Sequence, residues 1–252
     1  MCDSAQGFLW DRLERDGDLR GRTMKRIWEK GSVIRSNTLH MFRSYETVSK
    51  TIRIEPRLSK IGRTSWEVVF EVRNDEEDEN REDTSIARLT TTMVATDEEH
   101  TKSVALPNPD KLRGLISGNV KYATMTKDPR TRFVRASTKT AKLRWQSRVR
   151  VTDCDKFGHV NNAIYPLLCE EARAWGSQQF DTTRASTLAL MPANFCSVNY
   201  IGQARPLDDL VVLTHFDEES DCFYFDIQAD GHLVAEVILG VDSNSSDRIA
   251  RL

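Results

Sequence analysis

One segment in the second half of the sequence brings together residue types that can do chemistry. Residues 151–165 read VTDCDKFGHVNNAIY, in which two acids alternate, a glycine permits a turn and a helix is expected to begin at or near Asn161. This order places a carboxylate and an imidazole at a helix N-terminus, where unpaired N–H groups and the positive end of the helix dipole face outward. Such a site can hold a carbonyl oxygen that becomes an oxyanion, and one good donor typically lowers the barrier by about 3–4 kcal/mol.

Each member of this segment also has an ordinary role. An Asp or Asn before a helix is most often a cap, so capping and loop bracing are the expected roles of Asn161 and Asn162. A single Asp or His would equally be structural. The combined spacing D-x-D-x-x-G-H-V-N-N-x-x-Y is far more specific than any one of its residues, and it marks this segment as the candidate site.

The flanking sequence predicts the elements that position the site. Before it, residues 142–152 alternate between apolar and polar, which is typical of a half-buried strand. The apolar face of that strand would consist of Leu143, Trp145, Val149 and Val151. After it, residues 161–180 have the spacing of an amphipathic helix, whose buried stripe would consist of Ile164, Leu167, Leu168, Ala172 and Trp175.

The remaining strand signals fall into two clusters. Runs rich in β-branched and aromatic residues cover 48–54, 65–72 and 86–96 in the first cluster, and 195–201, 210–216, 222–229 and 232–241 in the second. A short helix is expected over 23–32. A helix with several antiparallel strands in each cluster predicts an α+β fold, in which the helix lies against a sheet.

The two clusters look like copies of one plan. Matching positions in them are separated by 145 to 147 residues, namely Trp28 and Trp175, Ile54 and Tyr200, and Asp97 and Asp242. Agreement between three separate segments indicates an internal duplication of about 146 residues.

Length and composition exclude several classes of protein. The chain has 252 residues, of which 39% are hydrophobic and 29% charged, so it can build one large or two smaller packed domains and is not a disordered or collagen-like chain. No stretch approaches the roughly 18–20 apolar residues of a membrane span, and the start lacks the features of a secretory signal. We therefore expect a soluble intracellular protein.

Charge and cysteine content restrict the partners. The net charge is −2, so the chain as a whole does not suit nucleic acid. The five cysteines include no CxxC pair, so neither a disulfide framework nor a zinc site is favoured, and no metal or cofactor is expected.

Residues 75–83 form an acidic run that predicts a solvated loop, whereas residues 111–150 contain twelve Lys and Arg against Asp128 alone. That basic stretch is either a solvated connector or a dock for phosphates or an acidic carrier protein.

The stretch DCDKFGHVNNAIY, followed by CEEARAW, resembles the hot-dog fold thioesterases, which include 4-hydroxybenzoyl-CoA thioesterases and the acyl-ACP thioesterases of plants. The motif covers residues 143–180. The resemblance implies two tandem hot-dog units, each an antiparallel sheet wrapped around a long helix. The implied order is a diverged N-terminal unit over 1–110, a basic linker over 111–140, a unit with the catalytic motif over 141–243 and a flexible tail over 244–252.

The resemblance also implies site residues. Asp155 matches the catalytic aspartate of these enzymes, His159 matches a histidine found in many of them, and Gly158, His159 and Val160 occupy the turn whose amides form the oxyanion hole. Where the plant enzymes have an asparagine two residues after the aspartate, this chain has Phe157. The first unit has no counterpart of the His-Val-Asn-Asn sequence, so one working site per chain is expected. The residues expected to contact the substrate are Arg148, Arg150, Phe157, Asn161, Asn162, Tyr165 and Arg205.

The implied activity is hydrolysis of a fatty acyl-CoA thioester to a free acid and coenzyme A. A thioester carbonyl has little resonance stabilisation and a good leaving group, so a carboxylate suffices either to attack it or to deprotonate a water. Three alternatives stay open: an acyl-ACP thioesterase, a hot-dog enoyl-CoA hydratase or dehydratase, and a non-catalytic acyl-CoA binding protein. The D-x-x-x-H spacing without Asn-Pro counts against the hydratase.

The last residues, Ala250-Arg251-Leu252, resemble the small-basic-leucine form of the peroxisomal import signal. They predict binding to the peroxisomal import receptor and a peroxisomal location, with the cytoplasm as the other possibility. The sequence leaves open the acyl chain length, the choice between CoA and a carrier protein, and whether the chain forms homo-oligomers.

Overall fold

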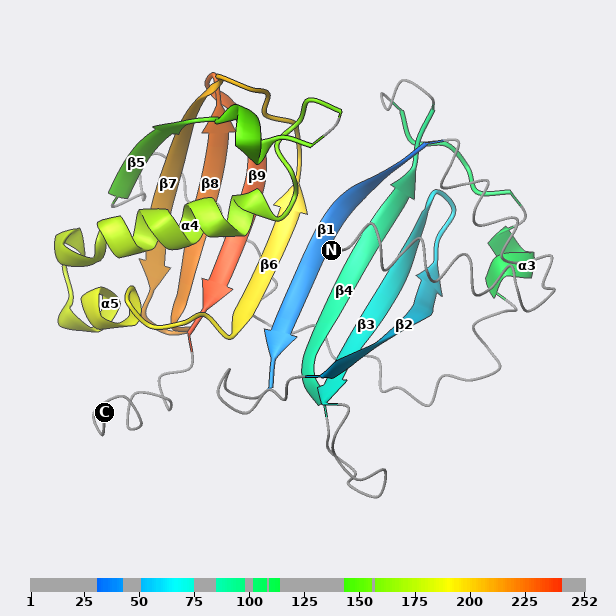
Figure 1. Ribbon diagram of the computed structural model, residues 1–252, viewed down its shortest axis with the longest axis horizontal. Coiled ribbons are helices and arrows are strands. Elements are labelled where there is room, and N and C mark those ends of the chain that lie inside the picture. Colours follow the sequence, from blue (N-terminus) through cyan, green and yellow to red (C-terminus); the bar gives the residue numbers. More distant parts are fainter. Residues whose placement is uncertain are drawn as a thin grey trace. The chain divides into compact units, whose positions relative to one another are not determined.

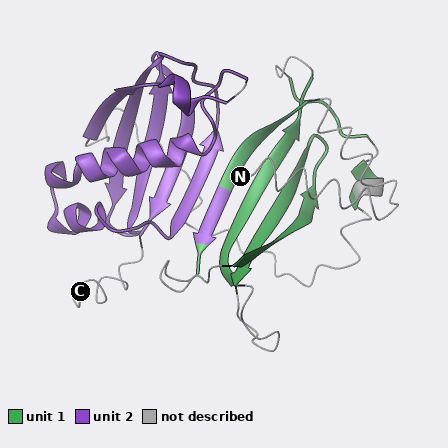
Figure 2. Ribbon diagram, in the orientation of Figure 1, with its two compact units in different colours: residues 1–37, 41–124 green, residues 38–40, 125–252 purple. Residues whose placement is uncertain are grey.

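A computed structural model describes residues 31–42, 51–74, 85–97, 102–107, 109–113, 143–155 and 157–241 of the chain (Figure 1). Several sequence predictions fall outside these residues: most of the helix over 23–32 (of which Ser32 lies in a strand), the acidic run at 75–83, most of the basic stretch before 143, and the tail that ends in Ala250-Arg251-Leu252. The chain divides into two compact units, Met1–Asn37 with Met41–Thr124, and Thr38–His40 with Met125–Leu252 (Figure 2).

The first unit is built on antiparallel strands. Its elements are β1 (Ser32–Met41), β2 (Ile52–Ile61), β3 (Ser65–Asn74), β4 (Ser85–Ala95) and the short helix α3 (Pro109–Arg113). The strand order is β2-β3-β4-β1, and Thr38–His40 of β1 count with the second unit. Trp66, Val68 and Phe70 alternate along β3 and are buried together with Met93 of β4, as the period of two in a strand requires.

Strand β2 continues beyond the point where its sequence predicted an end. The expected strand stopped at Ile54, but the observed one passes through Pro56 to Ile61. Proline cannot donate a ladder hydrogen bond, and it is tolerated here because β2 lies at the edge of this order. Strand β1 was not predicted, because polar residues such as Arg35 and Asn37 interrupt its apolar pattern.

The second unit has an antiparallel sheet with a helix across it. Its strands are β5 (Leu143–Arg148), β6 (Phe195–Tyr200), β7 (Asp209–Asp217), β8 (Cys222–Ala229) and β9 (His232–Gly240), in the order β6-β9-β8-β7-β5. The helix α4 (Ile164–Trp175) packs against β6, β7, β8 and β9 (Figure 1). The short helices η3 (Val151–Asp153), η4 (Ser177–Gln179) and α5 (Thr183–Leu188) complete the unit. All five strands match predicted ones.

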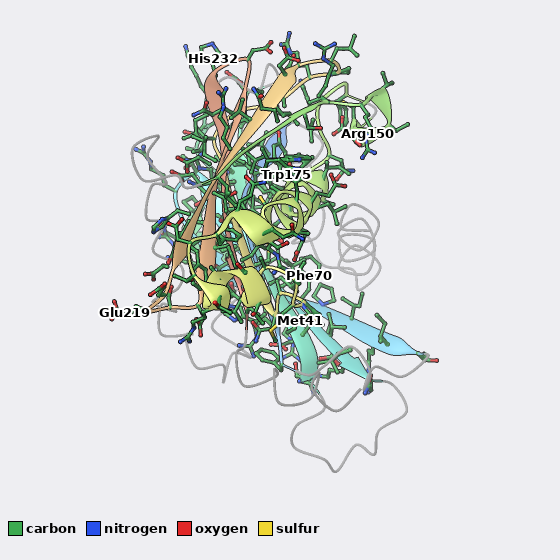
Figure 3. The ribbon with its side chains drawn as sticks, turned by 90° about the vertical axis from the view of Figure 1, so that its left-hand side faces the viewer. Met41, Phe70, Arg150, Trp175, Glu219 and His232 are labelled. Carbon is green, nitrogen blue, oxygen red and sulfur yellow. The ribbon has the colours of Figure 1, made fainter. Side chains whose placement is uncertain are left out.

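Helix α4 buries a different stripe from the predicted one. Its buried residues are Tyr165, Leu168, Cys169, Ala172 and Arg173. Leu167 and Trp175, which were expected on the buried side, are 55% and 52% exposed (Trp175 is labelled in Figure 3). The charged Arg173 takes a buried position because its guanidinium donates to the carbonyls of Leu188 and Met191 and pairs with Glu170, so the stripe is rotated about the helix axis.

The strand before the site also differs at its end. Leu143 and Val149 are buried as predicted, but β5 stops at Arg148 and Val151 is exposed in the η3 turn. Within the described residues, no helix is long and apolar enough to cross a membrane.

The neighbouring leucines of α4 provide a matched test of this rotation. Leu168→Ala should lower the free energy of unfolding by about 2–4 kcal/mol, because it leaves a cavity between the helix and the sheet. Leu167→Ala should change it by less than about 0.5 kcal/mol, because that side chain is exposed. Urea unfolding measures both, and equal losses would contradict the observed stripe.

Candidate active site

The candidate site begins where β5 ends, at a turn held together by Asp153. This residue is 5% exposed. Its carboxylate accepts hydrogen bonds from the backbone N–H of Arg150 (3.0 Å) and from the guanidinium Nε of Arg150 (3.0 Å). Its own backbone carbonyl accepts the N–H of Asn161 at 2.9 Å. Asp153 therefore connects the end of the strand with the turn that leads into α4 (its partner Arg150 is labelled in Figure 3).

The charge of Asp153 is stabilised by its partner. Burial by itself would raise the pKa of Asp153, but the side-chain and backbone hydrogen bonds from Arg150, together with its positive charge, lower the pKa below the usual value. Asp153 therefore stays ionised across the neutral range although it is buried.

Residues 154–155 and 157–160 lie next to Asp153, between the end of η3 and the turn that leads into α4. Cys154 and Val160 make an isolated antiparallel bridge, and the N–H of Asp155 donates to the carbonyl of His159 at 2.8 Å. Gly158 closes the tip with φ of 76°, in the left-handed region that favours glycine. The loop is thus a short hairpin with Asp155 and His159 opposite each other near its tip.

Asp155 is exposed, and its two carboxylate oxygens differ. Oδ1 accepts the N–H of Phe157 at 2.8 Å and the N–H of His159 at 3.3 Å. Oδ2 accepts no hydrogen bond from the part of the chain that the structure describes. The carboxylate is therefore held by one oxygen and presents the other.

The amides of the turn are paired, which corrects the expectation of outward-facing, unpaired donors. The N–H of Gly158 donates to the Asp155 carbonyl (3.1 Å) and that of Val160 to the Ala204 carbonyl (2.9 Å). The N–H of His159 donates to Asp155 Oδ1 and makes the longest of these bonds, 3.3 Å. An oxyanion would have to compete with these partners, and the His159 amide is the easiest to recruit.

The helix also starts later than expected. Helix α4 begins at Ile164, and Asn161 braces the turn before it by accepting the N–H of Ala163 on its side chain and the N–H of Ile164 on its carbonyl. The bracing role predicted for Asn161 is confirmed. The carbonyl of Asn162 accepts the hydroxyl of Tyr200 at 2.9 Å, so Asn162 is tied to β6 by its backbone.

Tyr165 is 2% exposed and lies inside the second unit rather than at a surface that a substrate reaches in this structure. Its hydroxyl accepts the N–H of Ala204 at 3.4 Å, and its ring packs edge-on against Tyr200 with centroids 5.7 Å apart. Burial raises the pKa of Tyr165. These contacts give Tyr165 a bracing role between α4 and the segment after β6.

The candidate basic residues differ in how they are engaged. Arg148 pairs with Asp209 and Arg150 with Asp153, whereas the exposed Arg205 forms no ion pair within the described residues. Phe157, the residue in place of the plant asparagine, is 70% exposed. The loop of Arg205 is joined to the site through the bond from Val160 to Ala204.

The thiols near the site are poor nucleophiles. Burial is the main cause that raises the pKa of Cys154, and the nearby Asp153 and Asp155 raise it further. Burial raises the pKa of Cys169 well above its usual value and that of Cys196 to about 12. The described residues contain no group of three or more His, Cys, Asp or Glu that is placed to hold a metal ion.

A separate open hollow of about 570 Å³ lies over the second half of α4. It includes none of the predicted site residues, and it is lined by Glu170, Glu171, Arg173, Ala174 and residues 189–193. Glu170, which lines this hollow, forms an ion pair with Arg173.

Sequence reasoning missed the residues that support the loop. Asp153 was noticed only as the first acid of the D-x-D spacing, and Tyr200 was not singled out. Leu207 was also missed: it is 65% exposed with φ of 74°, a strained conformation for leucine, and its N–H donates to the carbonyl of Val149. Only the D-x-D spacing carried a usable signal, because the other contacts join distant parts of the chain.

Comparisons with known proteins address the fold. The sequence matches no family model and no curated protein. The structure is similar to an acyl-ACP thioesterase from Bacteroides thetaiotaomicron, with a TM-score of 0.62 and 12% identity over 84% of this chain and 76% of that one. It is also similar to a 12:0-ACP thioesterase from Umbellularia californica, with a TM-score of 0.65 and 18% identity over 95% of this chain and 87% of that one.

The pH dependence of stability tests the state of Asp153. The pKa of Asp153 is lower in the folded chain than in the unfolded chain, where it is near 4. The ionised carboxylate therefore stabilises the fold at pH values above the unfolded-state pKa, and this stabilisation is lost as the pH falls through the folded-state pKa. The stability difference between wild type and Asp153→Asn, from urea unfolding, should therefore be largest above about pH 5 and shrink towards pH 3. A difference that is constant over this range would contradict an ionised, stabilised carboxylate.

These two likenesses, at identities below 20%, establish that the chain has the fold of these structures, the hot-dog fold that the motif predicted.

Proposed function

We propose that the chain is a thioester hydrolase that cleaves acyl-CoA thioesters with Asp155 as its catalytic carboxylate. The observation that carries this proposal is the geometry of Asp155, with Oδ1 held by two backbone amides and Oδ2 left open beside His159. The fold and the acyl-ACP thioesterases that share it support the same reaction class, as an analogy of fold.

The open oxygen allows two routes to the same products. In one, Oδ2 attacks the thioester carbon, the C–S bond breaks, and a water then hydrolyses the resulting anhydride. In the other, Oδ2 takes a proton from a water that attacks the same carbon. Both routes convert thioester and water into carboxylic acid and thiol. With the plant asparagine replaced by Phe157, either route relies on Asp155 and His159 to position the water.

The His159 amide is the proposed oxyanion donor. It makes the longest bond among the three turn amides, so it can shift from Asp155 Oδ1 to a developing oxyanion at the lowest cost. A donor of this kind is typically worth about 3–4 kcal/mol of barrier. Arg205 is the proposed contact for the phosphates of coenzyme A, because Arg148 and Arg150 already have carboxylate partners.

An acyl-ACP substrate is the second candidate. It is favoured by the two structural relatives, both of which are acyl-ACP thioesterases. Comparing kcat/KM for the same acyl group on coenzyme A and on a carrier protein decides between the two carriers.

The two compact units are proposed to be tandem hot-dog units. The spacing of 145 to 147 residues between matching positions and the antiparallel strands of both units support a duplication. We infer that the first unit has no active site of its own, because it lacks a His-Val-Asn-Asn sequence.

Replacing the proposed catalytic carboxylate tests the function directly. Asp155→Asn should lower kcat/KM for acyl-CoA hydrolysis by about a hundredfold or more, because the amide can neither attack nor accept a proton. Asp221→Asn, which removes a carboxylate paired with Arg184 at another turn, should leave the rate unchanged. Thiol release from acyl-CoAs of varied chain length measures both variants. Hydrolysis that persists in Asp155→Asn would contradict the proposal, and binding without turnover by the wild type would indicate a carrier.

Two glycines with the same backbone conformation separate stability from activity. Gly158 and Gly231 have φ of 76° and 79°, and a Cβ at either would meet no atom within 4 Å. Alanine at each position should cost about 1 kcal/mol of stability from strain alone. Only Gly158→Ala should also reduce turnover, because it distorts the loop that carries Asp155. Equal effects on turnover would argue against a role for this loop.

A further inference from the structure

We infer that Asp153 is a positioning residue, which holds the loop that presents Asp155 through the carboxylate–guanidinium pair with Arg150. This inference rests on the proposed function. No role for Asp153 was predicted from the sequence, and the acid that reacts in the proposed function is Asp155, two residues later.

Asp153 is not available to react with a substrate. It is 5% exposed, and both carboxylate oxygens accept hydrogen bonds from Arg150: Oδ1 from Nε at 3.0 Å, and Oδ2 from the backbone N–H at 3.0 Å. A buried carboxylate is tolerated only when such partners replace its hydration. Both carboxylate oxygens are therefore used to bind Arg150 and stabilise the turn.

Two backbone hydrogen bonds connect Asp153 with the residue that carries the reactive carboxylate. Asn161 N–H donates to the carbonyl of Asp153 at 2.9 Å, and Asp155 N–H donates to the carbonyl of His159 at 2.8 Å. Together they make the isolated bridge between Cys154 and Val160. The first bond ends on Asp153 itself, so a shift of that residue displaces the bridge and Asp155 with it.

The opposite side of the loop is anchored independently. Val160 N–H donates to the carbonyl of Ala204, and the carbonyl of Asn162 accepts the hydroxyl of Tyr200. Weakening the pair of Asp153 and Arg150 therefore releases one side of the loop while the other stays attached to the unit. We expect this to displace Asp155 without unfolding the unit, and a displacement of about 1 Å is enough to slow a reaction about a hundredfold.

The exposed Arg150 gives a test that does not depend on a buried substitution. Its side chain is 68% exposed, so Arg150→Gln should fold normally. Its backbone N–H still reaches Asp153 in that variant, so only the guanidinium part of the pair is lost. The loss of turnover should therefore be smaller than in Asp153→Asn.

The experiment is a double-mutant cycle with steady-state kinetics on one acyl-CoA. Asp153→Asn should lower kcat about 10- to 100-fold and Arg150→Gln about 3- to 10-fold, each with KM changed less than about threefold. The double variant should be no slower than Asp153→Asn alone, because both changes remove one interaction. Amide hydrogen exchange at Asp155 and Asn161, whose bonds lie on the released side of the loop, should be faster in Asp153→Asn. Asp221→Asn, which also removes an Asp–Arg pair, should leave kcat, KM and this exchange unchanged.

The outcomes separate this inference from the proposed function. A wild-type chain that hydrolyses no thioester overturns the function, and the inference falls with it. An active wild type whose kcat stays within twofold in Asp153→Asn overturns the inference alone. A rise in KM with unchanged kcat in Arg150→Gln would assign that arginine to the substrate and likewise overturn it. If Asp153→Asn does not fold, Arg150→Gln alone tests the inference. A kcat of Arg150→Gln equal to that of the wild type would then contradict it.

Discussion

The buried carboxylate of Asp153 is the constraint on which the site depends. A charge with 5% exposure remains in a folded protein only when local partners compensate it, and Arg150 provides both a backbone and a side-chain donor. This compensation fixes the end of β5, and the carbonyl of Asp153 then fixes the start of the turn into α4. The candidate loop is short because a hydrogen bond from the Asn161 N–H to the Asp153 carbonyl joins its first and last residues.

This constraint determines what chemistry the loop can offer. A hairpin closed at its base leaves its tip exposed, and the tip carries Asp155 with one oxygen bound and one open. Burial raises the pKa of the neighbouring thiols Cys154 and Cys169, which leaves the carboxylate of Asp155 as the proposed nucleophile or base. A thioester suits such a weak base, since its leaving group needs little acid assistance.

Sequence reasoning found the elements around the site better than their details. The strands of the second unit were predictable because β-branched and aromatic residues dominate them, and the loop because its spacing is specific. Of the stripe predicted on α4, Leu168 and Ala172 are buried but Leu167 and Trp175 are exposed, because the buried face is rotated to include the charged Arg173. Arg173 is buried through carbonyls of Leu188 and Met191, which lie 15 and 18 residues away, and no local pattern shows such partners.

The same limit applies inside the site. The bracing role of Asn161 was predictable, because an Asx turn before a helix is a local feature. The pairing of Val160 with Ala204 and the burial of Tyr165 against Tyr200 were not, because they join segments about 40 residues apart. The expectation of free amides failed only in part for this reason: Val160 donates to the distant carbonyl of Ala204, whereas Gly158 and His159 donate to Asp155 within the loop.

The most direct test of the account is a crystal structure of the full chain with a non-hydrolysable thioether analogue of an acyl-CoA bound. The account predicts that the carbon corresponding to the thioester carbonyl lies about 3–3.5 Å from Oδ2 of Asp155, with its oxygen or equivalent group near the amide of His159. An analogue whose reactive carbon instead lies in the hollow over the second half of α4, with Asp155 still in solvent, would contradict it.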